Sequence, residues 1–358
     1  MSPPDAGEYR GQLGPISVAV VSPYDLGRRG GVQDQVLGLV SWLRDEGHDA
    51  WAVGPGDGPA GSISVGRAAS VSINGSRAPV ALGPGTVSRV RAAVAGADLI
   101  HVHEPFVPLA SLAAGRARDA VLVGTFHADP SPALRRVYRA GGWALRRLLV
   151  PYRALTAVSP VAAAAVARLR AVALVPNGLD LDAFDSAPKA THRAVFVGRD
   201  DPRKGLDVLL DAWRLVRREV PDAELVVISD RHGHDVAGVD FVGQVDDPTK
   251  RHLLAGAAVA VCPNLAGESF GMVVVEAMAA GCAVVASALP AFAHVLDEAG
   301  ALAKPGDAEG LAATIVRVIT DDDALSTLQQ RARQRVEQFD RHSVVAGYLS
   351  AYQSALAR

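Results

Sequence analysis

Short apolar runs alternate with longer segments of mixed polarity along almost the whole chain. The first run, ISVAVVS, covers Ile16–Ser22, and a Gly-rich turn and a helical pattern from about Val32 to Glu46 follow it. Continuous apolar runs bounded by turn residues are typical of strands that are buried on both faces. The alternation therefore predicts parallel sheets whose two faces are covered by helices.

One polar segment, DSAPKATHR at Asp185–Arg193, interrupts this alternation. Before it, we expect strands in DAWAV, DLIHVH, AVLVGTFH, LTAVS and VALVPNGLD, and helices at Ser88–Ala95 and Ala133–Leu149. After it, we expect strands in AVFVGR, AELVVIS, VDFVGQV and VAVCPN, and helices at Gly205–Glu219 and Thr249–Gly256. The pattern predicts two doubly wound α/β domains, residues 1–184 and 185–342, and a helix over 343–358 that packs back on the first domain. Ligands of such sheets bind at the carboxyl ends of the strands, here in a cleft between the domains.

The composition narrows the class of protein. The chain has 358 residues, a formal net charge of −2 and 49% hydrophobic residues, so it lacks the basic surplus of a nucleic-acid-binding protein. Its two cysteines, Cys262 and Cys282, give no disulfide framework and no metal-ligand spacing, and we expect both in the core. We find no apolar run of about 20 residues that could span a bilayer, and no apolar core of a signal peptide.

The first candidate chemistry lies at the start of the second half, in VGRDDPRKG at Val197–Gly205. Arg199 and Lys204 follow a strand in a loop that opens a helix, where a guanidinium fork and an ammonium group suit a diphosphate. A solvated loop with incidental charges is the alternative. The lysine carries extra weight because only four of the 36 basic residues are lysines.

The second candidate is the apolar stretch NLAGESFGMVVVEAMAAGCAVVAS at Asn264–Ser287, which carries two carboxylates, Glu268 and Glu276. A buried carboxylate is costly unless a partner satisfies it, so the acids either lie on a wet face by accident or face a ligand rich in hydroxyl groups. We expect a loop at GESFG and a helix from about Phe270. The carboxylates could then accept hydrogen bonds from sugar and ribose hydroxyls, while the first amides of the helix receive a phosphate.

These motifs resemble a known family. GESFGMVVVEAMAAG, with GRDDPRKG upstream, resembles the E-x7-E motif and phosphate loop of the retaining glycosyltransferases of family four. Segments along nearly the whole chain, among them SPYDLGRRGGVQDQVLGL, HVHEPFVP, TFHAD, VPNGLD, FVGQVDD and PNLAGESFG, are similar to the phosphatidylinositol α-mannosyltransferases of that family. The resemblance implies a GT-B fold of two Rossmann-like domains. It also implies retaining transfer of mannose from GDP-mannose to the inositol of phosphatidylinositol or a related lipid.

The resemblance further implies a role for each matching residue. The GGVQ loop (Gly30, Gly31, Val32 and Gln33) approaches the β-phosphate, Arg199 and Lys204 hold the diphosphate, Glu268 holds the sugar hydroxyls and Glu276 the ribose. Ser269, Phe270 and Gly271 complete the donor site, and Val245 and Asp246 lie beside the nucleobase. Tyr24, Asp25, Gln33 and His127 bind the acceptor. The expected catalytic residues are His127, Arg199, Lys204 and Glu268.

The resemblance implies chemistry without a divalent metal and without a cofactor besides the nucleotide sugar. The leaving phosphate helps to take the acceptor proton, and cations and helix dipoles, rather than a metal, offset the phosphate charge. Two alternatives stay open. One keeps the fold and mechanism with another nucleotide sugar, such as UDP-glucose or UDP-N-acetylglucosamine, and a soluble glycoside or inositol acceptor. The other is a non-catalytic nucleotide-sugar-binding homologue, against which the intact set of candidate residues argues.

A basic stripe indicates a possible lipid contact. Five arginines interleave with apolar residues between 134 and 149, so this helix either lies on anionic lipid or presents a solvated face. They are Arg135, Arg136, Arg139, Arg146 and Arg147. We expect a cytoplasmic protein in peripheral contact with the inner face of the cell membrane, without a nucleic-acid partner.

Overall fold

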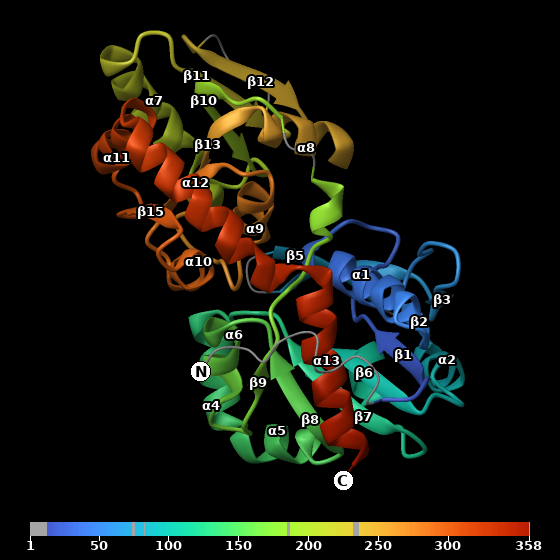
Figure 1. Ribbon diagram of the computed structural model, residues 1–358. Coiled ribbons are helices and arrows are strands. Elements are labelled where there is room, and N and C mark those ends of the chain that lie inside the picture. Colours follow the sequence, from blue (N-terminus) through green and yellow to red (C-terminus); the bar gives the residue numbers. More distant parts are fainter. Residues whose placement is uncertain (1–12, 74–75, 82, 185–186, 232–235, 358) are drawn as a thin grey trace. The chain divides into compact units, whose positions relative to one another are not determined.

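Figure 1 shows the protein as a computed structural model, which describes residues 13–73, 76–81, 83–184, 187–231 and 236–357. Contacts within the chain divide it into two compact units. The first consists of residues 1–178 and 341–358, and the second of residues 179–340. The chain therefore returns to the first unit with its last helix, α13 (Arg341–Leu356).

The first unit is built on a seven-stranded sheet in the order β3-β2-β1-β6-β7-β8-β9, in which all neighbouring strands are parallel. The strands are β1 (Ser17–Val21), β2 (Asp49–Gly54), β3 (Ile63–Ser64), β6 (Leu99–His103), β7 (Val121–Phe126), β8 (Tyr152–Ala157) and β9 (Ala173–Leu174). The strand order changes direction between β1 and β6. Ligands of open parallel sheets bind beside the carboxyl ends of the strands at such a switch point.

Two helices from distant parts of the sequence form the core of this unit with β1 and β2. The helix α1 (Gly31–Asp45) buries Val36, Leu39 and Leu43, which share one helical face. Helix α13 adds Tyr348 and Tyr352 to the same cluster. The other helices are α2 (Thr86–Ala93), α3 (Ala110–Ala114), α4 (Pro132–Ala140), α5 (Gly142–Leu149) and α6 (Pro160–Val166). An antiparallel hairpin, β4 (Ala68–Ile73) and β5 (Ser76–Ala81), completes the unit.

The second unit has a six-stranded parallel sheet in the order β12-β11-β10-β13-β14-β15. Its strands are β10 (Ala190–Val197), β11 (Glu224–Ile228), β12 (Val239–Gly243), β13 (Ala257–Cys262), β14 (Ala283–Ser287) and β15 (Gly300–Ala303). Its helices are α7 (Leu206–Glu219), α8 (Asp247–Ala255), α9 (Met272–Ala279), α10 (Pro290–Leu296), α11 (Ala308–Thr320) and α12 (Asp322–Val336). This order is that of a dinucleotide-binding fold, with the switch point between β10 and β13.

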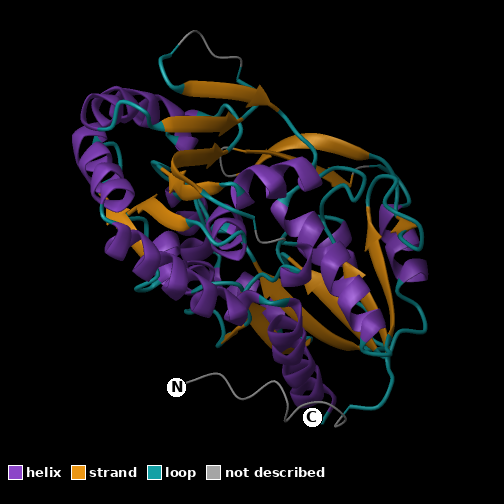
Figure 2. Cartoon of the chain, turned by 45° about the horizontal axis from the view of Figure 1, so that its top comes forward, coloured by secondary structure: helices purple, strands orange, loops and turns teal. Residues whose placement is uncertain are grey.

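Both faces of the second sheet are covered, and Figure 2 shows helices flanking its strands. Trp213 of α7 and Ile315 of α11 pack with Phe196 of β10 in one buried cluster. Val195, the neighbour of Phe196, points to the opposite face and is also buried. Burial on both faces explains why these strands appear in the sequence as continuous apolar runs.

The parallel sheets confirm the architecture predicted for both halves, but two of the expected elements differ from those in the structure. The helix expected at Ala133–Leu149 is two helices, α4 and α5, because adjacent glycines at Gly141 and Gly142 disfavour a continuous helix. The polar segment Asp185–Arg193 is not all linker, because β10 begins at Ala190 and pairs with β13. None of the described helices is long and apolar enough to cross a bilayer.

Candidate active site

The loops after β10 and β13 meet at the switch point of the second sheet and bring Lys204 and Glu268 together. Lys204 Nζ contacts Glu268 Oε1, and Asn264 Nδ2 donates to the same carboxylate oxygen at 2.7 Å. The side chains of Lys204 and Glu268 are 25% and 15% exposed, so the pair is shielded but reachable from solvent. The lysine that the sequence predicts to bind the diphosphate and the carboxylate that it predicts to bind the sugar therefore form an ion pair with each other.

Gly205 allows the two loops to approach each other. Its φ is +73°, and a Cβ atom placed there would lie 2.1 Å from the carbonyl oxygen of Pro263. Only glycine combines this backbone conformation with so close a contact. The turn after β10 therefore needs Gly205 to set Lys204 beside the loop that carries Glu268.

The two arginines of the turn after β10 have different surroundings. Arg203 forms an ion pair with Asp201 at 2.6 Å, and this hydrogen-bonded partner lowers the pKa of the Asp201 carboxyl to about 2. The side chain of Arg199 is exposed and forms no hydrogen bond or ion pair within the described parts of the chain. Of the two, Arg199 has its full set of donors available for an anion.

The other predicted glutamate, Glu276, has its carboxylate satisfied by a second ion pair. Glu276 lies on α9, and its Oε1 is 2.8 Å from Nζ of Lys250 on α8. Asp247 lies 3.5 Å from the same ammonium group, and its charge and that of Glu276 raise the pKa of Lys250 against the effect of burial. Sequence reasoning missed Lys250, although it is one of only four lysines in the chain.

The other sequence-predicted donor residues surround these pairs at the carboxyl edge of the sheet. Asp246 caps α8 by accepting a hydrogen bond from the amide of Thr249, and Val245 precedes it. Gly271, with φ of +106°, is the N-cap of α9, which begins two residues later than expected. The ring of Phe270 is buried against Phe339, and Ser269 is half-buried.

In the first unit, the loop after β1 carries the GGVQ residues. Gly30 is the N-cap of α1, and the buried Gln33 side chain lies over it: a Cβ atom at Gly30 would be 2.6 Å from Gln33 Oε1. Nothing lies within 4 Å of a Cβ at Gly31, and Val32 is half-buried. The loop thus has exposed backbone at Gly31 and the buried side-chain amide of Gln33 beside Gly30.

Tyr24 and Asp25 occupy the same end of β1. Tyr24 pairs with Val80 of the β4–β5 hairpin through a β-bridge, and Asp25 accepts a hydrogen bond from the amide of Gly27 at 3.0 Å. Burial, with a smaller contribution from the charge of Glu104, raises the pKa of the Tyr24 phenol, which therefore stays neutral.

His127, directly after β7, is coupled to His103 at the end of β6. His103 Nδ1 and His127 Nε2 are 2.7 Å apart, and both side chains are buried. Burial lowers the pKa of His127 to about 4 and that of His103 well below its usual value. The pair is neutral at physiological pH, and the N–H of one ring donates a hydrogen bond to the unprotonated nitrogen of the other.

Glu104, which sequence reasoning also missed, fixes the backbone at His127. Its Oε1 accepts hydrogen bonds from the amides of His127 and Ala128, both at 2.7 Å. Burial raises its pKa against the opposing effect of these two bonds. Its φ of +51° is a rare, costly conformation for glutamate, and such strain concentrates at functional sites.

Three buried polar atoms here form no hydrogen bond of normal geometry within the described residues: His103 Nε2, His127 Nδ1 and Asn177 Oδ1, although Asn177 lies close enough to His127 to oppose the effect of burial on its pKa. Such atoms are rare in folded proteins and call for a ligand or an ordered water. Because the histidine pair can exchange donor and acceptor roles at its two free nitrogens, it can match either polarity of a ligand hydroxyl. The described residues contain no cluster of His, Cys, Asp or Glu that could hold a metal ion.

Two family models match the chain. One, described as Glycosyltransferase Family 4, matches residues 29–183, and the other, Glycosyl transferases group 1, matches residues 191–321. A phosphatidyl-myo-inositol mannosyltransferase of Mycolicibacterium smegmatis is 35% identical, covering 95% of this chain and 94% of its own. A protein of the same description from Propionibacterium freudenreichii is 36% identical over 79% of this chain and 80% of its own.

Solved structures agree on the fold. A sucrose-phosphate synthase from Thermosynechococcus elongatus matches with a TM-score of 0.70 at 21% identity, covering 96% of this chain and 99% of its own. Anabaena Alr3699/HepE in complex with UDP and glucose matches with a TM-score of 0.74 at 20% identity, covering 95% and 100%. The protein is a glycosyltransferase of the predicted GT-B fold class. Because it is 35–36% identical to these relatives over most of its length, the chain belongs to the family of the phosphatidyl-myo-inositol mannosyltransferases.

Proposed function

We propose that this protein transfers mannose from GDP-mannose to the inositol of phosphatidylinositol, with retention of the anomeric configuration. The observation that carries the proposal is the 35% identity, over nearly the whole length of both chains, to a phosphatidyl-myo-inositol mannosyltransferase. The two lysine–glutamate pairs at the switch point of the second sheet support a nucleotide-sugar donor, because each pair presents a carboxylate that can accept hydrogen bonds from hydroxyl groups, and Lys204 adds a cation for the diphosphate.

The donor occupies the second unit in this proposal. Its diphosphate takes the ammonium of Lys204 and the free guanidinium of Arg199, and this releases Glu268 to accept hydrogen bonds from the mannose hydroxyls. Glu276 accepts from the ribose hydroxyls, and the backbone of Ser269, Phe270 and Gly271 completes the site. The cations then stabilise the negative charge that develops on the leaving diphosphate.

The acceptor inositol lies against the first unit, between His127 and the loop after β1. A free nitrogen of the neutral His103–His127 pair hydrogen-bonds a ring hydroxyl, and Tyr24, Asp25 and Gln33 shape the site. The bond from the acceptor oxygen to the anomeric carbon forms on the face from which the phosphate leaves, and the leaving phosphate takes the acceptor proton. This order retains the configuration and uses no divalent metal.

Peripheral membrane contact through α4 and α5 belongs to the same proposal, because the acceptor is a bilayer lipid. The five arginines of 134–149 supply positive charge toward anionic headgroups. The two units together provide contacts for a water-soluble donor and a lipid acceptor.

The test is transfer of label in vitro. Purified protein with radiolabelled GDP-mannose and phosphatidylinositol vesicles should place label in the lipid phase, whereas labelled UDP-glucose should not. Excess EDTA should leave the rate within about twofold, while Glu268→Gln should lower it by about one to two orders of magnitude, because hydrogen bonds to a charged group contribute about 1.5–3 kcal/mol. Label from UDP-glucose, or only in a soluble inositol acceptor, would replace this proposal with the alternative substrates.

A further inference from the structure

Two buried polar atoms of the first unit lie close together without forming a hydrogen bond of normal geometry in the described chain. They are Nδ1 of His127 and Oδ1 of Asn177, whose residues are 5% and 7% exposed. Asn177 is near enough to raise the pKa of His127 against the larger, opposite effect of burial. A buried polar atom without a hydrogen bond is costly, so this pair of atoms calls for a ligand between them.

The first sheet brings Asn177 and His127 together from distant parts of the sequence. His127 directly follows β7 and Asn177 lies shortly after β9, so both are at the carboxyl edge of parallel strands. Gln35 of α1 holds the backbone beside Asn177. Its Nε2 donates to the carbonyl oxygen of Gly178 at 2.7 Å, and its Oε1 accepts from the Gly178 amide at 2.8 Å. The asparagine is therefore fixed at the edge where ligands of such sheets bind.

The hydrogen bond between His103 and His127 defines which ring nitrogens carry protons. The Asn177 side chain favours the protonated form of His127, as an oxygen that faces a ring N–H does. A neutral imidazole has one N–H and one acceptor nitrogen. His127 Nδ1 is accordingly the N–H, and its Nε2 accepts from His103 Nδ1 at 2.7 Å. Of the two arrangements open to the histidine pair, Asn177 selects this one.

We propose that His127 Nδ1 and Asn177 Oδ1 together bind one hydroxyl group of the acceptor inositol. A hydroxyl group accepts one hydrogen bond while it donates another, so a single group satisfies both atoms. An ether or carbonyl oxygen only accepts, and an ammonium group only donates, so each would leave one of the two atoms unpaired. Asn177 thereby becomes a specificity-determining residue for a polyol acceptor.

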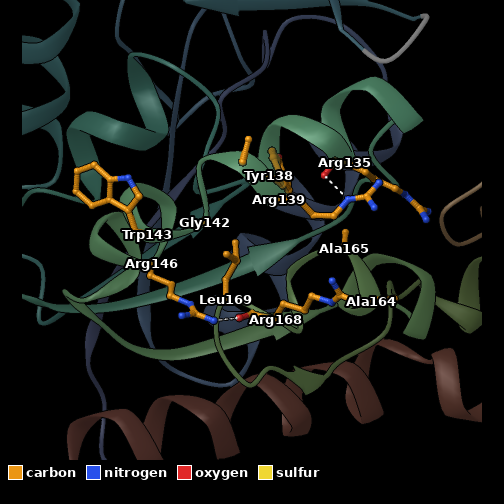
Figure 3. A pocket seen from close by; sticks show the side chains of 11 residues that line it. Arg135, Tyr138, Arg139, Gly142, Trp143, Arg146, Ala164, Ala165, Arg168 and Leu169 are labelled. Atoms are coloured by element: carbon orange, nitrogen blue, oxygen red, sulfur yellow. Dashed lines mark hydrogen bonds between the residues drawn. The ribbon is translucent and has the colours of Figure 1, made fainter.

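The inference deepens the proposed function and rests on it, because that proposal places the inositol beside His127. It does not depend on the membrane contact proposed for α4 and α5. The pocket between these helices and the end of α6, whose side chains Figure 3 shows, is lined by neither Asn177 nor His127. Transfer by wild type tests the proposed function, whereas the proton position on His127 tests the hydroxyl site without any substrate.

The first experiment measures transfer to short-chain phosphatidylinositol in detergent by Asn177→Leu, which keeps the size of the side chain and removes the acceptor oxygen. We expect KM for the lipid to rise about tenfold, with GDP affinity and hydrolysis of GDP-mannose without lipid within about twofold of wild type. Asn177→Asp keeps an acceptor oxygen and should restore KM to within about threefold. The matched control, Thr156→Val, removes a buried hydroxyl of β8 that hydrogen-bonds Thr125, and should change none of these quantities.

Acceptor analogues that each lack one ring hydroxyl then identify the group that is bound. One analogue should lose about tenfold in kcat/KM with wild type and lose nothing further with Asn177→Leu. Additive losses for every analogue, or an unchanged KM for the lipid in folded Asn177→Leu, would overturn the proposal. So would slower hydrolysis of GDP-mannose by Asn177→Leu without lipid, because the hydroxyl group would then belong to the mannose.

A second readout needs no turnover. In NMR spectra of protein with isotope-labelled histidine, the shifts of the two His127 ring nitrogens should place the proton on Nδ1, and this preference should be lost in Asn177→Leu. A proton on Nε2 in wild type would overturn the proposal even if the enzyme transfers mannose. Wild type that transfers no mannose would refute the proposed function, and with it the inositol as source of the hydroxyl, while the proton position still decides whether the site for a hydroxyl exists.

Discussion

The ion pair between Glu276 and Lys250 gives the sharpest test of the donor site. Replacing Glu276 by glutamine keeps the shape of the side chain but removes the charge that faces Lys250 at 2.8 Å. Hydrogen bonds to a charged group contribute about 1.5–3 kcal/mol. If the carboxylate accepts the ribose hydroxyls, its loss should weaken GDP binding by about tenfold to a hundredfold.

The same change should also lower the free energy of unfolding. Removing one partner of a fully buried ion pair costs about 3–5 kcal/mol. Here the two side chains keep 20% and 22% exposure, and Asp247 remains 3.5 Å from the lysine. We therefore expect a smaller loss, about 1–2 kcal/mol in urea titrations, which leaves the variant folded for binding measurements.

Isothermal titration calorimetry with GDP separates the ligand role from the structural one. Lys250→Met breaks the same ion pair but leaves the Glu276 carboxylate, so its affinity for GDP should stay within about threefold of wild type. Glu298→Gln, which alters a carboxylate that is 82% exposed in the same unit, is the matched control and should change neither quantity. Unchanged GDP affinity in folded Glu276→Gln would refute the assignment of Glu276 to the ribose.

Three further predictions concern stability, measured by urea denaturation. The folded-state pKa of His127 is about 4 against an ordinary 6.5, so its stabilising contribution is full above pH 6.5 and is lost as the pH falls toward 4. Wild type should lose about 2 kcal/mol more than His127→Gln between pH 7 and pH 5, and parallel pH curves would contradict this. Gly205→Ala should cost at least about 2 kcal/mol because of its φ of +73° and the 2.1 Å approach to Pro263; a loss below about 0.5 kcal/mol would show that the turn relaxes freely. Lys189→Met should cost about 3 kcal/mol, because the ammonium group donates to three carbonyl oxygens at 2.9–3.0 Å that the variant leaves without that partner; a neutral effect would mean that water replaces it.

The fold was largely predictable because parallel strands buried on both faces appear as uninterrupted apolar runs. The prediction of elements failed where the backbone conformation does not follow the pattern of polar and apolar residues. Residues 191–193 near the start of β10 are polar, yet the strand begins before them at Ala190, which pairs with Ala257 of β13, far away in the sequence. The break between α4 and α5 depends on Gly141 and Gly142, whose effect a helical pattern of apolar positions does not reveal.

Some residues of the candidate site were also predictable from the sequence, and others were not. The cost of burying Glu268 and Glu276 was visible in the sequence, and the rarity of lysine pointed to Lys204. The same rarity would have pointed to Lys250, had it been applied there. His103 and Glu104 were not predictable as partners of His127, because their contact depends on β6 and β7 being neighbours in the sheet.

The central claim, retaining transfer of mannose to the inositol of phosphatidylinositol, is tested most directly by the structure of the product. The lipid formed from GDP-mannose and phosphatidylinositol should be purified and its linkage determined by NMR spectroscopy and mass spectrometry. The account predicts one added hexose, joined to the inositol ring in the α configuration. A β-linked product, a hexose attached elsewhere, or no lipid product from a folded enzyme that binds GDP would contradict it.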